Sequence, residues 1–129
     1  MTKIPELFDR GIAIRKEVLG NAHVDGALKR ATAFDQDLQT LITQYAWGGI
    51  WSRPGLDHKT RSMLTIAMLA ALGRHEELKL HIRATRNTGV SQEEVKEILL
   101  QVAVYAGVPA GNSAFHQARV AYEELDKAP

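Results

Sequence analysis

The chain has 129 residues, of which 45% are hydrophobic and 24% are charged, and its formal net charge is +1. This composition predicts one globular domain over residues 1–129. So small a net charge gives no general attraction to nucleic acid or to an anionic membrane, so any bound anion needs locally placed arginines. The lack of cysteine excludes disulfides, thiolate zinc sites and thiol chemistry.

The start of the sequence and its apolar runs predict a cytoplasmic protein. The stretch MTKIPELFDR is charged from its first residues and lacks the apolar core of a signal peptide. The longest apolar run, IAMLAALG at residues 66–73, is far shorter than the roughly 20 residues that a membrane span needs. We therefore expect no membrane segment.

Helix signals recur in the first half of the chain, whereas the alternating pattern of a β-strand is missing. A first helix is predicted from Pro5 to about Val18, closed by Gly20. A second is predicted over residues 32–50, where large apolar side chains recur on one side. These side chains are Phe34, Leu38, Leu41, Ile42 and Tyr45.

The second half is predicted to hold four helices after a loop at residues 52–57 that contains a Pro-Gly pair. Their ranges are 57–72, 75–89, 91–107 and 109–125. Glycines follow the first three of these helices. The third opens with SQEE, which is the pattern of a capping box. The prediction is an all-α chain of about six helices.

Two segments are apolar nearly all round, namely SMLTIAMLAAL at residues 62–72 and ILLQVAVYA at residues 98–106. A helix that is apolar on every side is normally buried on every side. A six-helix chain of this length can hardly cover two such helices by itself. We therefore expect an obligate homo-oligomer in which some of this surface lies between subunits.

The segment EELKLHIRATRNTG, residues 76–89, has the period of a helix but carries Glu77 and His81 in the middle of its apolar side. Their i,i+4 spacing places them side by side. The pair could be buried and help to specify packing, although such a pair often gives no net stability over apolar residues. Alternatively it is a reactive pair, in which the carboxylate favours the protonated imidazole and His81 acts as a general acid. A metal site is the third interpretation, but the pair supplies only two ligands and would need others from facing helices.

Three arginines and two tryptophans are further candidates. Arg53 lies in the predicted loop, and Arg74 begins the helix of the Glu–His pair. Arg61 lies one turn into the apolar helix, a position that would draw its guanidinium inward. Each could be a solvated surface charge or could bind a carboxylate through its planar fork of donors. Trp47 and Trp51 could pack where a helix ends or form an aromatic wall beside Arg53.

The chain resembles the carboxymuconolactone decarboxylase family, and the resemblance extends over most of its length. The matching segments are AWGGIWSRPGLDHKTRSMLTIAMLAALGRHEELKLHIRATRNTG at residues 46–89 and EEVKEILLQVAVYAGVPAGNSAF at residues 93–115, and the similarity reaches back to IRKEVLG at residues 14–20. The wider superfamily includes alkylhydroperoxidase D-like proteins, which carry a Cys-x-x-Cys and a following His. In this chain those positions are occupied by Arg74, Glu77 and His81, so peroxide reduction by thiols is excluded.

The resemblance implies an all-α, alkylhydroperoxidase D-like fold, usually in trimer-based or hexameric assemblies. It implies cofactor-free decarboxylation of 4-carboxymuconolactone, a dicarboxylate lactone, to 3-oxoadipate enol-lactone in the protocatechuate branch of the β-ketoadipate pathway. On this hypothesis His81 delivers a proton and Glu77 orients it, although the reverse assignment stays open. The candidate substrate-binding residues are Arg61, Arg53, Trp51, Trp47 and Arg74. A non-catalytic or ligand-binding oligomer on the same scaffold is the alternative.

Overall fold

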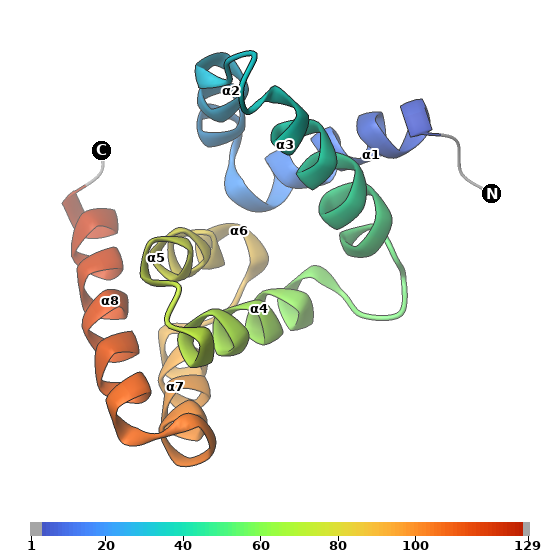
Figure 1. Cartoon of the computed structure of the whole chain (residues 1–129). Helices are drawn as coiled ribbons and strands as arrows, with labels where there is room; N and C mark the ends of the chain where they lie inside the picture. Colours follow the sequence, from blue (N-terminus) through green and yellow to red (C-terminus); the bar gives the residue numbers. More distant parts are fainter. Residues whose placement is uncertain (1–3, 128–129) are drawn as a thin grey trace. The chain divides into compact units, whose positions relative to one another are not determined.

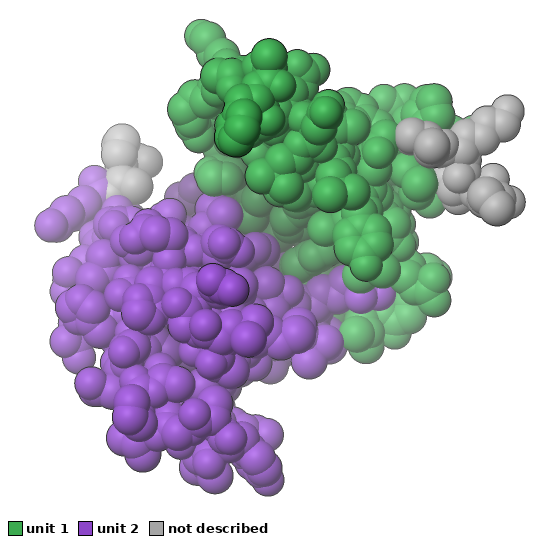
Figure 2. Space-filling view, in the orientation of Figure 1, with its two compact units in different colours: residues 1–58 green, residues 59–129 purple. Residues whose placement is uncertain are grey.

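The computed structural model describes residues 4–127, and all regular elements in that range are helical (Figure 1), which confirms the all-α prediction for this part of the chain. The chain divides into two compact units, residues 1–58 and 59–129, which are coloured separately in Figure 2. Each unit is described by itself below. Among the described helices, none has the length and apolarity that crossing a membrane requires.

Unit 1 begins with the predicted first helix and then departs from the prediction. Gly20 follows α1 with φ +95°, a conformation that suits glycine. The next helix, α2, was not expected, because its sequence NAHVDGALKR has only two large apolar residues, Val24 and Leu28, and an internal glycine, Gly26. The predicted helix over residues 32–50 starts later and continues as a π-helix, η1. The elements of unit 1 are α1 (Ile4–Leu19), α2 (Asn21–Arg30), α3 (Gln36–Leu41) and η1 (Ile42–Trp51).

The contact between α1 and η1 is unusually close. A Cβ atom added to Gly11 would overlap the Thr43 carbonyl oxygen, and one added to Gly48 would overlap the Leu7 carbonyl oxygen. The two helices therefore meet backbone to backbone at their glycines. This approach holds η1 against α1 and determines which α1 side chains become buried.

The apolar side predicted for residues 32–50 does not enter the core of unit 1. Phe34 is 97% exposed, and Leu38, Leu41 and Tyr45 are also exposed, while Ile42 is half-buried. Thr43, Trp47 and Trp51 are the buried side chains of η1 instead. The apolar side is thus left at the surface of the chain.

Unit 2 is built around a single apolar cluster. In it α8, the red helix in Figure 1, packs against α5 and α7. The predicted helix over residues 75–89 is interrupted at Ala84 and ends in one short further turn, α6. The elements are α4 (His58–Leu72), α5 (His75–Arg83), α6 (Thr85–Thr88), α7 (Gln92–Ala106) and α8 (Val108–Lys127). The buried cluster comprises Ile66, Ala70, Leu78, Ile82, Val90, Val95, Leu99, Val102, Ala114, Ala118 and Ala121.

The helix ends of unit 2 confirm the local signals in the sequence. Gly73, Gly89 and Gly107 have φ values of +73°, +85° and +108°. The capping box is present: the Glu94 backbone N–H donates to Ser91 Oγ at 3.0 Å, and the Ser91 backbone N–H donates to Glu94 Oε1 at 3.0 Å. That second bond and Lys59 hold the pKa of Glu94 below its ordinary value. This stabilisation is therefore present at neutral pH and is lost as the pH falls through the lowered pKa.

Replacing Ser91 by alanine should lower the free energy of unfolding by about 1 kcal/mol, because the first turn of α7 loses its side-chain acceptor. Urea unfolding at pH 7 measures this difference. Gln92→Ala is the matched control, since Gln92 is exposed one residue further on and takes no part in the cap. Equal stabilities for Ser91→Ala and wild type would contradict the prediction.

As expected from the two apolar segments, the single chain does not cover α4 and α7 on all sides. Each helix turns one face to the core and leaves large apolar side chains exposed on another. Those side chains are Leu64, Met68 and Leu72 on α4, and Leu100, Val104 and Tyr105 on α7. A groove of about 570 Å³, here called the α4–α7 groove, is lined by Thr60, Met63, Leu64, Ala67, Met68, Ala71, Ile98, Gln101, Val102, Tyr105 and Ala106. No charged side chain lines it.

Candidate functional site

Helix α5 carries the Glu–His pair, but it does not bury that pair in the core. Leu78 and Ile82 are the fully buried side chains of α5, whereas Glu77 is exposed and His81 is half-buried. At about 100° per residue, the direction of Leu78 and Ile82 lies well to one side of Glu77. The expectation that both groups occupy the middle of the buried face is therefore wrong for the isolated chain, whose core does not bury the pair.

The charges along α5 follow the helix dipole. Glu76 and Glu77 are in its first turn, while His81 and Arg83 are in its last turn, as the dipole favours. Lys79 pairs with Glu76 at 3.1 Å, and Arg83 pairs with Glu124 of α8 at 2.5 Å. Glu77 forms no ion pair with any described residue. Its carboxylate is thus available at the surface, one helical turn before the imidazole at the edge of the core.

Two of the candidate arginines belong to the same unit as this pair. Arg74 is exposed at the N-cap of α5, and its carbonyl accepts the first helical hydrogen bond, from the Leu78 N–H at 2.9 Å. Arg61 lies in the first turn of α4 and is half-buried. Its Nε is fully shielded from solvent, as expected if the guanidinium is drawn inward.

The other three candidates lie in unit 1. The rings of Trp47 and Trp51 are in contact, with centroids 4.7 Å apart and planes tilted by 32°. Trp51 also approaches His58, at a centroid distance of 5.9 Å. Both tryptophans are buried and Arg53 is exposed. The aromatic pair is therefore part of the packing at the end of η1, and a wall beside Arg53 stays a prediction.

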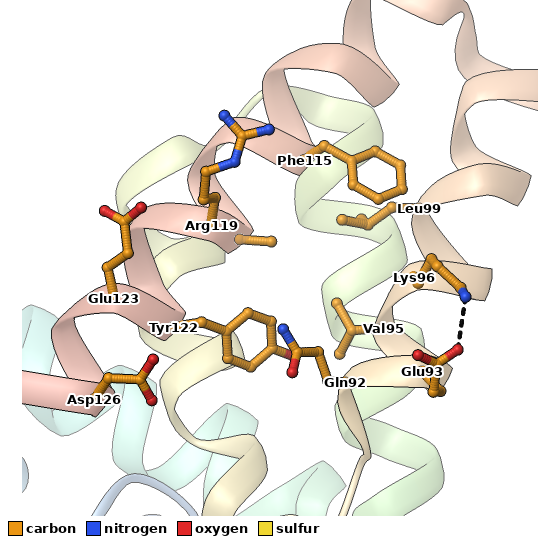
Figure 3. Close-up of a pocket in the computed structure, with 11 residues that line it drawn as sticks. Gln92, Glu93, Val95, Lys96, Leu99, Phe115, Arg119, Tyr122, Glu123 and Asp126 are labelled. Carbon is orange, nitrogen blue, oxygen red and sulfur yellow. Dashed lines mark ion pairs between the residues drawn. The ribbon is translucent and has the colours of Figure 1, made fainter.

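A cavity of about 420 Å³, which was not predicted, lies between α7 and α8. Figure 3 shows the residues that line it. Its apolar lining is Val95, Leu99, Phe115, Ala118 and Tyr122. Lys96, which pairs with Glu93 at 2.6 Å, lies on the α7 side, and Arg119, Glu123 and Asp126 follow one another along α8. Burial raises the pKa of Tyr122, so its hydroxyl stays protonated at neutral pH. None of the predicted site residues lines this cavity.

No three His, Asp or Glu side chains within residues 4–127 gather closely enough to hold a metal ion. The Glu–His pair on α5 therefore gains no third protein ligand within the described part of one chain. The predicted independence from metals is neither supported nor weakened by this observation.

The sequence is similar to a known protein family and to several known proteins over much of its length. The model of the carboxymuconolactone decarboxylase family matches residues 36–120, which is more than half of the chain and includes every predicted site residue. A 4-carboxymuconolactone decarboxylase of Acinetobacter baylyi is 48% identical over 122 residues, which is 95% of this chain and 91% of that protein. A nitrosuccinic acid decarboxylase of Metarhizium robertsii is 48% identical over 104 residues, which is 81% of this chain and 73% of that protein.

A 4-carboxymuconolactone decarboxylase of Pseudomonas putida is 42% identical over a shorter stretch of 41 residues, which is 32% of this chain and 85% of that protein. The matches agree with the sequence resemblance. This chain belongs to the carboxymuconolactone decarboxylase family.

Proposed function

We propose that this protein decarboxylates 4-carboxymuconolactone to 3-oxoadipate enol-lactone and carbon dioxide without a cofactor. The observation that carries the proposal is the 48% identity to the Acinetobacter baylyi enzyme over 95% of this chain. The similarity covers nearly the whole of both proteins, so it includes the helices of both units. A cytoplasmic location is part of the same proposal.

The proposed chemistry needs an electron sink, and the substrate itself provides one. The departing carboxylate is attached to the carbon γ to a conjugated lactone carbonyl. When the carbon–carbon bond breaks, its electron pair moves through the double bond onto the carbonyl oxygen of the lactone and gives a dienolate. A proton delivered to the α-carbon then completes the enol-lactone. The protein must therefore bind a dianion, stabilise the new oxyanion and supply one proton.

Unit 2 offers groups for these tasks. The half-buried position of His81 suits a proton donor that must reach substrate yet be partly shielded from bulk water. Glu77, one turn earlier, is the group that would orient and charge it. Arg61 is the choice for a substrate carboxylate, because its guanidinium is partly withdrawn from solvent. Substrate-binding roles for Arg74, Arg53, Trp47 and Trp51 are retained as predictions.

The second candidate is decarboxylation of nitrosuccinic acid, since that relative is equally identical over the part it shares. Its smaller coverage, 81% of this chain and 73% of that protein, places it behind the first. A nitro group is also a strong electron sink, so the same donor and cations could serve either reaction. A third possibility is a helical oligomer that binds a small ligand without turnover.

A direct assay separates these candidates. Freshly cyclised 4-carboxymuconolactone and, separately, nitrosuccinate are supplied to the full-length protein, and substrate loss is followed together with carbon dioxide release. The proposal expects stoichiometric carbon dioxide from the lactone and a much lower kcat/KM for nitrosuccinate. The reverse ratio would favour the second candidate, and no turnover of either would favour the non-catalytic one.

We also propose that the protein is a homo-oligomer, with a trimer or hexamer as the expected state. The support is the α4–α7 groove, which is uncharged, together with the exposed apolar side chains around it. Contiguous apolar surface of this kind usually marks an interface in a protein that stays in solution. A second copy with the same surface is the simplest partner.

Met68→Glu should reduce the oligomer to smaller species, because it places a charge in the middle of the groove, where it would have to be desolvated. Light scattering coupled to gel filtration at micromolar concentration measures the mass. Ala22→Glu on α2 adds the same charge at an exposed site of unit 1 and is the control. A wild-type protein that is monomeric, or a Met68→Glu variant of unchanged mass, would refute the proposed interface.

A further inference from the structure

The side chain of Arg15 occupies a setting that its own unit does not explain. It is 5% exposed and is the only charged side chain in the buried group of the described residues. Arginine is rarely buried this deeply unless a carboxylate pairs with it. The more exposed cations Lys16, Lys59 and Arg83 all have carboxylate partners, whereas Arg15 has none in the described chain.

The hydrogen bonds of Arg15 are few. Its Nη1 donates to Thr43 Oγ1 at 3.4 Å, which is longer than an ordinary N–H···O bond. Its Nε is buried and has no partner among the described residues. Burial of the guanidinium lowers the pKa of Arg15 from its ordinary value. Because arginine is a very strong base, the guanidinium stays charged.

The surroundings of this guanidinium are polar on the η1 side. Thr43 Oγ1 donates to the Gln39 carbonyl oxygen at 2.7 Å, and Gln39 lies one turn before it. The Gln39 Oε1 is also buried without a partner. A 180° flip of the Gln39 side-chain amide would exchange its oxygen and nitrogen and place an NH₂ donor at the position of Oε1. Arg15 Nε and Gln39 Oε1 are thus two buried polar atoms without partners on residues that are each hydrogen-bonded to Thr43, and the α1–η1 contact at Gly11 and Gly48 holds Arg15 and Thr43 together.

We propose that Arg15, with Thr43 and Gln39, forms a carboxylate-binding site within unit 1. A carboxylate would accept two hydrogen bonds from Arg15, one from Nε and one from a terminal nitrogen of the guanidinium. This bidentate geometry is the one that arginine favours. It would supply the missing negative charge in a setting where little water competes. The π-helical turn at Thr43 fits this role, since π-helical segments are rare and often occur at functional sites.

The carboxylate site at Arg15 does not depend on the proposed reaction. It concerns a carboxylate as such, whether it belongs to the substrate or to another small molecule. The competing explanation is a buried water that joins the Arg15 and Gln39 side chains. A water would satisfy the same atoms, but it would give the site no affinity for anions. The two explanations therefore differ in a measurable property.

The first test is calorimetric titration of the full-length protein with adipate, a stable dicarboxylate, beside sulfate and the uncharged adipamide. We expect saturable binding of adipate alone, and about 10- to 100-fold weaker binding in Arg15→Gln, since a charge-assisted contact is lost. Arg10→Gln removes the same charge from an exposed site on α1 and should bind adipate like wild type. No saturable adipate binding, sulfate binding in its place, or unchanged binding in Arg15→Gln would each overturn the proposal.

Two further measurements remain valid if Arg15→Gln does not fold. In the wild type, the NMR signal of the Arg15 Nε–H should shift with adipate and saturate; a signal unaffected by adipate would overturn the site. The Arg15→Met variant should keep or raise Tm without ligand, because a poorly compensated buried charge has been removed, and should lose the rise in Tm with adipate. A fall in Tm with the rise in adipate retained would show a purely structural role.

Activity then identifies the source of the carboxylate. If Arg15→Gln weakens adipate binding and also raises KM for 4-carboxymuconolactone, the site holds a substrate carboxylate. If it weakens adipate binding while KM is unchanged, the site holds a different molecule. Both results support a carboxylate site. Failure of the wild type to turn over the lactone would refute the proposed reaction without affecting the binding result.

Discussion

Replacing His81 by glutamine is expected to lower kcat by about 10²- to 10⁴-fold while the protein stays folded and keeps its mass, because the proposed proton donor is removed. Glutamine keeps a similar size and a polar end, and the site is half-buried, so packing should change little. Steady-state kinetics on the lactone, with circular dichroism and light scattering on the same sample, measure the three quantities.

The chain provides matched controls for this experiment. His75→Gln changes an exposed histidine at the start of the same helix and should leave kcat unchanged. Glu77→Gln should lower kcat if this carboxylate orients His81, whereas Glu76→Gln should not, because Glu76 is exposed and pairs with Lys79. A His81→Gln protein that is folded, oligomeric and as active as wild type would refute the proposed donor.

Gly48→Ala is expected to destabilise unit 1 by about 3 kcal/mol or more, because the new methyl group would overlap the Leu7 carbonyl oxygen. The atom in the way belongs to the backbone of α1, so η1 could accommodate the methyl only by moving away from that helix. Urea unfolding monitored by tryptophan fluorescence is a suitable measurement, since Trp47 and Trp51 are both in η1.

The neighbouring glycine is the control for this substitution. A Cβ atom on Gly49 would meet its nearest atom, the Gln44 carbonyl oxygen, at 3.4 Å, which is an ordinary contact. Gly49→Ala should therefore be neutral or slightly stabilising, because alanine favours helical backbone more than glycine does. Equal losses of stability in the two variants would show that the close contact with α1 is not the cause.

Helix ends were the most predictable part of the fold, because their signals are local. Ser91 and Glu94 need only each other to form a capping box, and Gly73 needs only its own lack of a Cβ. Helix α2 escaped prediction because its sequence has few large apolar residues and an internal glycine, Gly26. The π-helical conformation of η1 also escaped prediction. So did its close contact with α1, since a glycine in a sequence does not indicate which backbone it will contact.

The candidate site was predictable in its residue types but not in its orientation. The spacing of Glu77 and His81 correctly places them one turn apart on a helix, yet the rotation of that helix is decided by Leu78 and Ile82 packing in the unit 2 core. Arg15 could not be singled out at all. In the sequence it is one basic residue beside another, and its burial arises only from the meeting of α1 with η1.

The exposed apolar groove has a consequence for how this protein is made. If two copies associate through this groove, as proposed, a newly synthesised chain exposes Leu64, Met68 and Tyr105 until it meets a second copy. Encounter of two such chains rises with the square of their concentration, while chaperones and aggregates compete for the same surface. The yield of folded protein should therefore depend on the concentration that newly made chains reach. Strong dilution of the purified enzyme should shorten the time over which it stays active.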